Sequence, residues 1–164
     1  MRLEQKVAIV TGGGSGLGEA TSLRLAEEGA SVVVADIDPE DAKRVASTIE
    51  RRGGEAIAIT QDVTDEAGWQ DVMRETLERY RKLDVLVNNA GIVLPANIED
   101  ATLEDWRTTH RVNLDGVFLG CRAAVRSMKN SGGGSIINTS SVEGLVDGKG
   151  LRRLAWKPIQ SERP

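Results

Sequence analysis

A glycine-rich stretch near the amino terminus has the residue types and spacing of a phosphate-binding turn. An apolar run ends at Val10, the stretch Thr11-Gly12-Gly13-Gly14-Ser15-Gly16-Leu17-Gly18 follows, and a helical pattern begins near Leu17. Glycines let the backbone turn tightly and approach a ligand that any Cβ atom would obstruct. The N-terminus of a helix attracts anions, because its unpaired N–H groups carry partial positive charge. We therefore expect a pyrophosphate to bind at this turn.

The spacing of the glycines distinguishes two versions of such a turn. The dinucleotide fingerprint G-x-G-x-x-G does not fit, because Leu17, Ser15 or Thr21 falls where a glycine is required. The pattern T-G-x-x-x-G-x-G does fit, with its glycines at positions 12, 16 and 18. A flexible glycine and serine loop is the alternative, which the strand before it and the helix after it disfavour.

An acidic residue ends the next apolar run. Asp36 lies 18 residues after Gly18, where a dinucleotide-binding turn expects a carboxylate that accepts hydrogen bonds from the adenosine ribose. This position favours NAD over NADP, because a 2′-phosphate would meet the carboxylate and neither Ser15 nor Ile37 offers a cation. The alternative is an acid that caps a turn at a strand end, a role that Asp38 already fills.

Strand-like and helical patterns alternate along the chain, which indicates βαβ units and a parallel sheet of the α/β class. Right-handed crossovers and a reversal after the third strand give the order 3-2-1-4-5, a Rossmann-type doubly wound sheet. Ligands of such sheets bind at the carboxyl ends of strands 1 and 4, where the polar motifs cluster. The expected strands are Val7–Val10, Ser31–Ala35, Glu55–Thr60, Val85–Asn88 and Ser135–Asn138.

Two of the helices between these strands have clear start signals. Asp38 before Pro39 is an N-cap followed by proline at the first helical position. Thr102 and Asp105 have the spacing of a capping box, and we expect one long helix from Thr102 to about Met128.

The segment Asn88-Asn89-Ala90-Gly91, at the end of the fourth expected strand, completes a set of motifs. Two amides there can join neighbouring strand ends, whereas an asparagine-rich turn without a ligand is the alternative. Together with the glycine turn, this segment resembles the short-chain dehydrogenase/reductase family, and the resemblance covers roughly Leu3 to Leu145. The cofactor-binding residues that it implies are Thr11, Gly12, Gly14, Ser15, Gly16, Leu17, Gly18, Asp36, Ile37, Asp62, Val63, Asn89, Ala90 and Gly91.

The resemblance also implies roles for single residues. Asp62 and Val63 would flank the adenine ring of a nicotinamide dinucleotide. Asn113 would help to hold a water that links the family's active-site lysine to solvent. Ser141 would orient an alcohol or carbonyl substrate.

The resemblance fails at the residues that perform the family's reaction. A tyrosine that acts as general acid and base, and a lysine four positions later, belong about a dozen residues beyond Ser141. Leu154 and Pro158 stand there instead, and Tyr80 is the only tyrosine. We expect an NAD-dependent oxidoreductase by descent that is catalytically inactive as this chain. The alternatives are a non-catalytic NAD-binding module and a truncated, non-functional product.

Composition and charge restrict the remaining function classes. The 164 residues are 40% hydrophobic and 28% charged, with a net charge of −4, which is typical of one soluble domain. No apolar run approaches the roughly 20 residues of a membrane span, and no signal peptide is evident, so we expect a cytoplasmic protein. A lone cysteine, Cys121, and a lone histidine, His110, disfavour a disulfide and a metal site.

The chain is expected to divide at about residue 147. Residues 1–147 would form the NAD-binding domain, with a sheet that lacks the family's later strands. Residues 148–164 are unlike the family, and from Lys149 onward they hold five basic residues and one acidic residue. Because Trp156 is their only aromatic residue, we expect a solvated tail and no nucleic-acid site.

The helix from Thr102 to about Met128 is expected to leave apolar surface uncovered. In the family, as the resemblance implies, this helix pairs with the following one to form a subunit interface. Without that partner, and with a fifth strand that exposes backbone groups, we expect self-association or dependence on a full-length relative. The apolar residues of the helix are Leu103, Trp106, Val117, Phe118, Cys121, Val125 and Met128.

Overall fold

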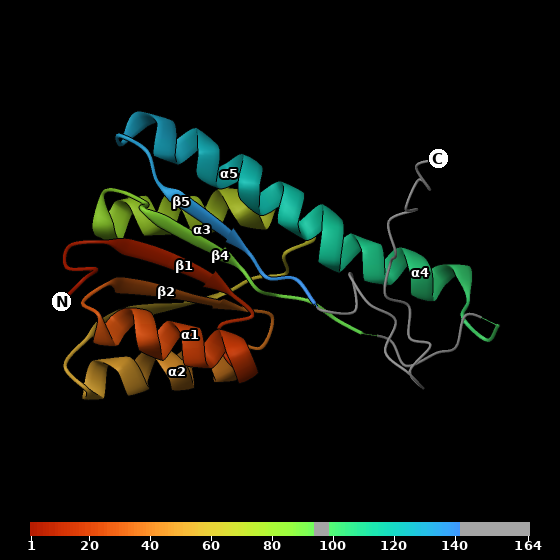
Figure 1. The fold of residues 1–164 in the computed structure, drawn as a ribbon, viewed down its shortest axis with the longest axis horizontal. Coiled ribbons are helices and arrows are strands. Elements are labelled where there is room, and N and C mark those ends of the chain that lie inside the picture. Colours follow the sequence, from red (N-terminus) through yellow and green to blue (C-terminus); the bar gives the residue numbers. More distant parts are fainter. Residues whose placement is uncertain (94–98, 142–164) are drawn as a thin grey trace, which may run out of the picture.

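The computed structural model describes residues 1–93 and 99–141, and the tail expected over 148–164 lies outside them. In this part of the chain, five parallel strands form one sheet in the order β3-β2-β1-β4-β5 (Figure 1). The predicted fold class and strand order are therefore confirmed. The strands are β1 (Val7–Thr11), β2 (Ser31–Asp36), β3 (Glu55–Thr60), β4 (Val85–Asn88) and β5 (Ser135–Asn138).

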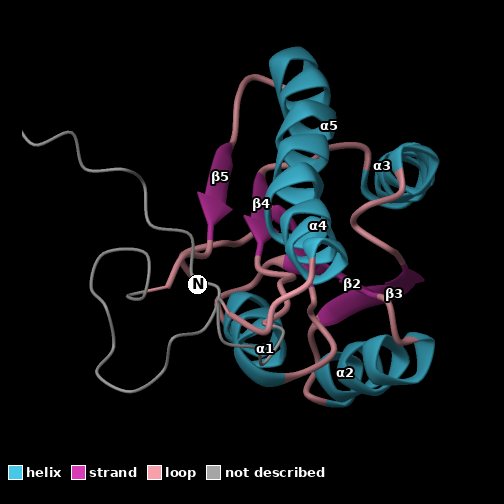
Figure 2. Ribbon diagram, turned by 90° about the vertical axis from the view of Figure 1, so that its right-hand side faces the viewer, coloured by secondary structure: helices cyan, strands magenta, loops and turns pink. Residues whose placement is uncertain are grey.

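Helices cover both faces of the sheet. α1 (Gly16–Glu27) and α2 (Pro39–Arg51) lie on one face, and α3 (Glu66–Tyr80) and α5 (Gly116–Asn130) lie on the other (Figure 2). Successive residues of a strand point to opposite faces, so Ile9 and Val10 of β1 enter different hydrophobic cores. Burial on both faces explains why β1 is a continuous apolar run.

Side-chain caps begin the helices that follow β2 and β3. Asp38 accepts hydrogen bonds from the backbone N–H groups of Glu40 and Asp41 at 2.9 and 3.2 Å, so α2 starts at Pro39 as expected. Asp65 caps α3 by accepting from the N–H of Ala67 at 2.9 Å. These caps keep the turns after both strands short and close to one edge of the sheet.

The expected long helix runs without a break over residues 103–130, as α4 (Leu103–His110), a π-helical turn and α5. α4 begins with the predicted capping box, in which Thr102 and Asp105 each bond to the other's backbone N–H. Residues Arg111–Asp115 form the π turn, which adds a residue per turn, and α5 follows it. Such turns are frequent at functional sites, and Asn113 lies at the centre of this one. None of the helices in the described part of the chain has the length and apolar character of a membrane span.

Candidate functional site

A cavity of about 410 Å³ lies at the carboxyl ends of the strands. Its wall comes from the segments after β1, β2, β3 and β4 and from the π turn. Eleven of the fourteen predicted cofactor-binding residues line it: Gly12, Ser15, Gly16, Leu17, Asp36, Ile37, Asp62, Val63, Asn89, Ala90 and Gly91. The other three do not line the cavity but contact residues that do: Thr11 contacts Asn89, Gly14 contacts Asp36, and Gly18 contacts Gly12.

Contacts at Gly12 and Gly18 close the glycine turn and leave no room for a side chain at either position. Gly12 has a φ of +60°, a left-handed conformation that glycine adopts without strain. A Cβ atom on Gly18 would lie 1.9 Å from the carbonyl oxygen of Gly12 and 2.6 Å from Nδ2 of Asn89. The first turn of α1 therefore packs directly on the backbone after β1. Ser15 and Leu17, at the start of that helix, face the cavity where an anion would be favoured.

Hydrogen bonds join the ends of β1, β4 and β5. The Asn89 Nδ2 donates to the Thr11 carbonyl at 3.0 Å, and the Thr11 hydroxyl accepts from the N–H groups of Asn89 and Ala90, both at 3.0 Å. The Asn88 Nδ2 donates to Oδ1 of Asn138 at 2.9 Å. The two amides thus have the strand-joining role that the sequence predicts.

Asp36 is buried at the end of β2, and each of its oxygens already accepts one hydrogen bond. Oδ2 accepts from the N–H of Gly14 at 2.8 Å, and Oδ1 accepts from the N–H of Asp38 at 3.1 Å. The second bond is the turn-capping role considered as the alternative, so Asp36 both caps its turn and lines the cavity. A carboxylate has about four lone-pair sites, so two remain for donors on a ligand.

The turn after β3 brings Asp62 and Val63 to the cavity. Asp62 is exposed and accepts from the N–H and the hydroxyl of Thr64, both at 2.8 Å. The Val63 carbonyl accepts from the buried indole N–H of Trp69 at 2.9 Å, which fixes the turn against α3.

Sequence reasoning missed Gln61, which also lines the cavity. Its residue is only 4% exposed, and neither amide atom has a hydrogen-bond partner within the described residues. A buried amide without a partner costs free energy, and a polar ligand could remove that cost. The sequence held one signal for this residue. Gln61 is polar, although Ile59 and Val63, two residues away on either side, are core residues.

Asn113 is bound to the loop after β4. Its Nδ2 donates to the carbonyl of Ile92 at 2.9 Å, and its Oδ1 accepts from the N–H of Ile92 at 2.8 Å. Ile92 and Val112 line the cavity and were also missed. Each adjoins a recognised motif residue, Gly91 or Asn113, and this adjacency was the only sequence signal.

Ser141, the remaining predicted active-site residue, lies near the carboxyl ends of the strands, whereas Tyr80 lies near their amino ends. Ser141 is exposed and follows β5 by three residues, at the end where the cavity lies, although it does not line it. Tyr80 ends α3 near Glu55, the first residue of β3, at the other end. Burial raises the pKa of Tyr80, and the charge of Glu55 acts in the same direction. Tyr80 therefore has neither the position nor the acidity of a proton donor for this site.

A second hollow of about 400 Å³ lies between α3 and α5. Met73, Leu77 and Leu119 line it together with Arg74 and Arg122, and none of the predicted site residues does. Within residues 1–93 and 99–141, no group of His, Cys, Asp and Glu side chains could hold a metal ion.

A parallel sheet of order 3-2-1-4-5 with a glycine turn after its first strand defines the Rossmann class of domains. Residues 6–152 match the family model described as short chain dehydrogenase. The chain belongs to the short-chain dehydrogenase/reductase family, as the sequence motifs indicate.

Individual relatives share most of this chain. It is 45% identical to the 2,5-dichloro-2,5-cyclohexadiene-1,4-diol dehydrogenase LinX of Sphingobium indicum and 46% identical to the NADP-dependent (R)-specific alcohol dehydrogenase of Lentilactobacillus kefiri. Each match covers 88% of this chain and 58% of the relative, so the chain spans little more than half of their length. A solved 7α-hydroxysteroid dehydrogenase, complexed with NADH and 7-oxo glycochenodeoxycholic acid, superposes with a TM-score of 0.85 at 33% identity. That match covers 90% of this chain and 57% of the other.

Proposed function

We propose that this chain is the NAD-binding part of a short-chain oxidoreductase that transfers hydride between a nicotinamide and an alcohol or carbonyl substrate. The main support for this function is the cavity at the strand ends, which has the glycine turn and the buried Asp36 in its wall. Among the relatives, one is complexed with NADH and another is named NADP-dependent, so the family alone leaves the cofactor open. The choice of NAD here is supported by Asp36.

The residues present fit a nicotinamide dinucleotide. The N–H groups at the start of α1 would hold the pyrophosphate, and the close approach of Gly18 to Gly12 packs that helix start against the backbone after β1. Asp36 and Ile37 would hold the adenosine ribose. The unpartnered amide of Gln61 lies where a polar ligand is needed. When bound, the cofactor supplies the group that accepts or donates the hydride.

The remaining assignments extend the same proposal along the cavity. Asp62 and Val63 would flank the adenine ring, and Asn89, Ala90 and Gly91 would lie beside the nicotinamide ribose. Asn113 would position the loop at Ile92, and Ser141 would orient the substrate. Because Leu154 and Pro158 occupy the positions of the family's tyrosine and lysine, we propose that this chain binds the cofactor without turning over a substrate. The absence of the family's tyrosine and lysine also favours a second candidate function, that of a non-catalytic NAD-binding module.

The chain should bind NADH more tightly than NADPH. Hydrogen bonds to a charged group contribute roughly 1.5–3 kcal/mol, or about 10- to 150-fold in affinity. Asp36→Ala removes these bonds and the repulsion of a 2′-phosphate, so it should erase most of the preference in titration calorimetry. The control is Glu40→Ala, which removes an exposed carboxylate that pairs with Lys43 outside the cavity. Equal or tighter binding of NADPH by the unmodified chain would defeat the assignment of Asp36.

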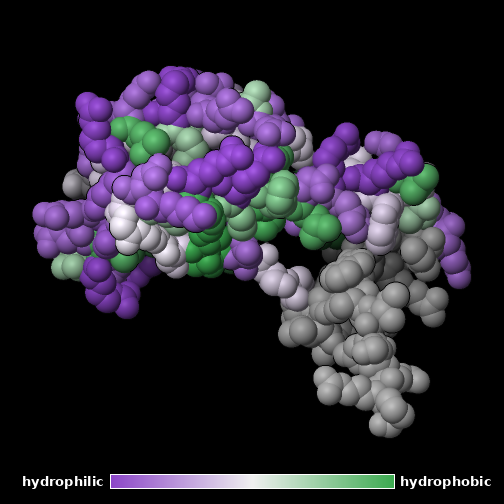
Figure 3. All heavy atoms as spheres, turned by 90° about the horizontal axis from the view of Figure 1, so that it is seen from above, coloured by the Kyte–Doolittle hydropathy of each residue, from purple (hydrophilic) through white to green (hydrophobic). Residues whose placement is uncertain are grey.

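We also propose that the chain self-associates through the surface of α4 and α5. Apolar side chains interrupt the polar surface over these helices (Figure 3). Leu103 and Phe118 are 62% and 60% exposed, and Val125 is 40% exposed. Met128, which we expected to be uncovered, is buried at 5% because it packs in the core on the sheet. On β5, Ile137 adds to the open apolar surface at the strand that ends the sheet.

Sedimentation velocity should therefore show association that depends on protein concentration. Phe118→Glu places a charge in the apolar surface and should shift the chain toward monomer. Ser47→Glu adds the same charge at an exposed position of α2, on the opposite face of the sheet, and should leave association unchanged. A monodisperse monomer with a cooperative melt, in the unmodified chain, would contradict this proposal.

A further inference from the structure

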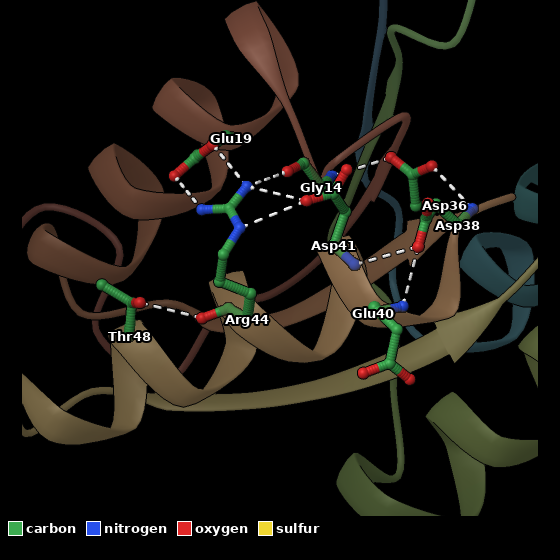
Figure 4. A network of polar contacts seen from close by, with 8 residues as sticks. All are labelled: Gly14, Glu19, Asp36, Asp38, Glu40, Asp41, Arg44 and Thr48. Atoms are coloured by element: carbon green, nitrogen blue, oxygen red, sulfur yellow. Dashed lines mark hydrogen bonds and ion pairs between the residues drawn. The ribbon is translucent and has the colours of Figure 1, made fainter.

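Arg44 of α2 is directed at the glycine turn and is bound there by three groups (Figure 4). Its Nη1 and Nη2 donate to the two carboxylate oxygens of Glu19 at 2.8 and 2.9 Å. The Nη2 also donates to the carbonyl oxygen of Gly14 at 2.6 Å, and Nε donates to Oδ1 of Asp41 at 3.2 Å. The guanidinium is thus held in one place by α1, α2 and the turn between β1 and α1.

The charge of Arg44 is more than balanced by its partners. The hydrogen bond from Arg44 lowers the pKa of Glu19, and the bonds to Glu19 and then Asp41 raise the pKa of Arg44. The Arg44 side chain is nevertheless 47% exposed and that of Glu19 is 29% exposed. Arg44 is therefore tethered by its carboxylate partners and is not enclosed by packing.

Gly14 connects this guanidinium to the carboxylate of the cavity. Its N–H donates to Oδ2 of Asp36 at 2.8 Å, while its carbonyl accepts from Arg44 at 2.6 Å. A Cβ atom on Gly14 would lie 2.9 Å from Oδ2 of Asp36 and 2.8 Å from Cβ of Asp41, so these groups converge on one glycine. Only one residue of backbone separates Arg44 from the position assigned to the ribose.

We propose that Arg44 is able to bind the 2′-phosphate of an NADP-type cofactor. In the unmodified chain, the Glu19 carboxylate binds the guanidinium in place of that phosphate. The planar guanidinium binds phosphate and carboxylate with the same two-pronged geometry, so Glu19 is a direct competitor for it. Loss of Asp36 would open the site and free the N–H of Gly14 as a further donor. Loss of Glu19 would remove the two-pronged carboxylate partner of the cation, which Asp41 and Gly14 would still hold in place. Once Asp36 is lost, discrimination between the two cofactors thus depends on Glu19, an inference that rests on the proposed dinucleotide binding.

The test compares NADH and NADPH affinities by titration calorimetry for Asp36→Ala, Glu19→Gln and the double variant. Asp36→Ala alone should bring the two affinities close together. Glu19→Gln alone should leave the ratio of NADH to NADPH affinity within about threefold of its value in the unmodified chain. The double variant should prefer NADPH by about tenfold, the low end of the range for charge-assisted hydrogen bonds. Arg44→Met added to the double variant should abolish that gain.

Each outcome has a distinct meaning. A double variant whose affinity ratio equals that of Asp36→Ala would overturn the inference, as would a gain for NADPH that survives Arg44→Met. In both cases NADH binding by the unmodified chain would leave the proposed function intact. Failure of the folded, unmodified chain to bind either nucleotide would overturn the proposed function and this inference with it. Thermal melts followed by circular dichroism verify that each variant is folded.

Discussion

Gly18→Ala should weaken NADH binding by about 100-fold and destabilise the fold by about 3 kcal/mol, the upper end of the cost of overpacking. The reason is steric, because the new methyl group would lie 1.9 Å from the backbone oxygen of Gly12. Neither backbone can move alone, since Asn89 ties the segment after β1 to β4. The turn must therefore open, and the N–H groups at the start of α1 lose their alignment. Calorimetric titration and chemical unfolding measure the two effects.

Gly68→Ala is the matched control, because Gly68 is also a helical glycine. A Cβ atom there would approach only the side chain of Asp65, at 3.1 Å, and alanine stabilises a helix relative to glycine by up to about 1 kcal/mol. Its NADH affinity should equal that of the unmodified chain. Equal behaviour of Gly18→Ala and Gly68→Ala would show that the contact between Gly18 and Gly12 does not shape the binding site.

Saturation with NAD should produce no alcohol oxidation above background. General acid–base catalysis contributes about 10²- to 10⁴-fold, and the chain has no tyrosine other than Tyr80, which lies near the amino ends of the strands. Asn113 has both functional groups of its side chain bound to Ile92, and a serine such as Ser141 is no substitute for a tyrosine and lysine pair. The measurement is NADH absorbance with a panel of alcohols, with a full-length relative as positive control.

A turnover that persists in the purified chain would have to be traced to this site before it counted against the proposal. Asp36→Ala and Gly18→Ala serve that purpose at a subsaturating NAD concentration, because both should weaken cofactor binding rather than substrate binding. Steady oxidation that disappears in both variants would mean that the chain has a proton donor other than the family's tyrosine. The proposal of binding without turnover would then be wrong.

Local sequence patterns were sufficient where the structure depends on neighbouring residues. The bounds expected for β3, β4 and β5 agree with the structure, because each is a short apolar run between turn residues. The caps at Asp38 and Thr102 were likewise readable, since their partners lie two or three residues away. The same locality made the glycine turn readable, because strand, turn and helix are contiguous.

Contacts between distant residues were not readable from one sequence. The π turn within the expected long helix holds Asn113, whose partner Ile92 lies 21 residues earlier. The bond from Arg44 to Gly14 spans 30 residues, so the cation near Asp36 was missed when only Ser15 and Ile37 were considered. Spacing along the chain gives no indication of which helix faces a turn until the sheet is assembled.

Two-dimensional ¹H–¹⁵N NMR of the folded chain, titrated with NADH, tests the central claim most directly. The claim predicts saturable shifts of backbone amides in four segments, 12–18, 36–37, 61–63 and 89–92, with little change at Leu119 and Arg122 beside the hollow between α3 and α5. A folded chain that shows no saturable shifts, or shifts gathered at that hollow, would contradict the assignment of the cavity at the strand ends as the dinucleotide site.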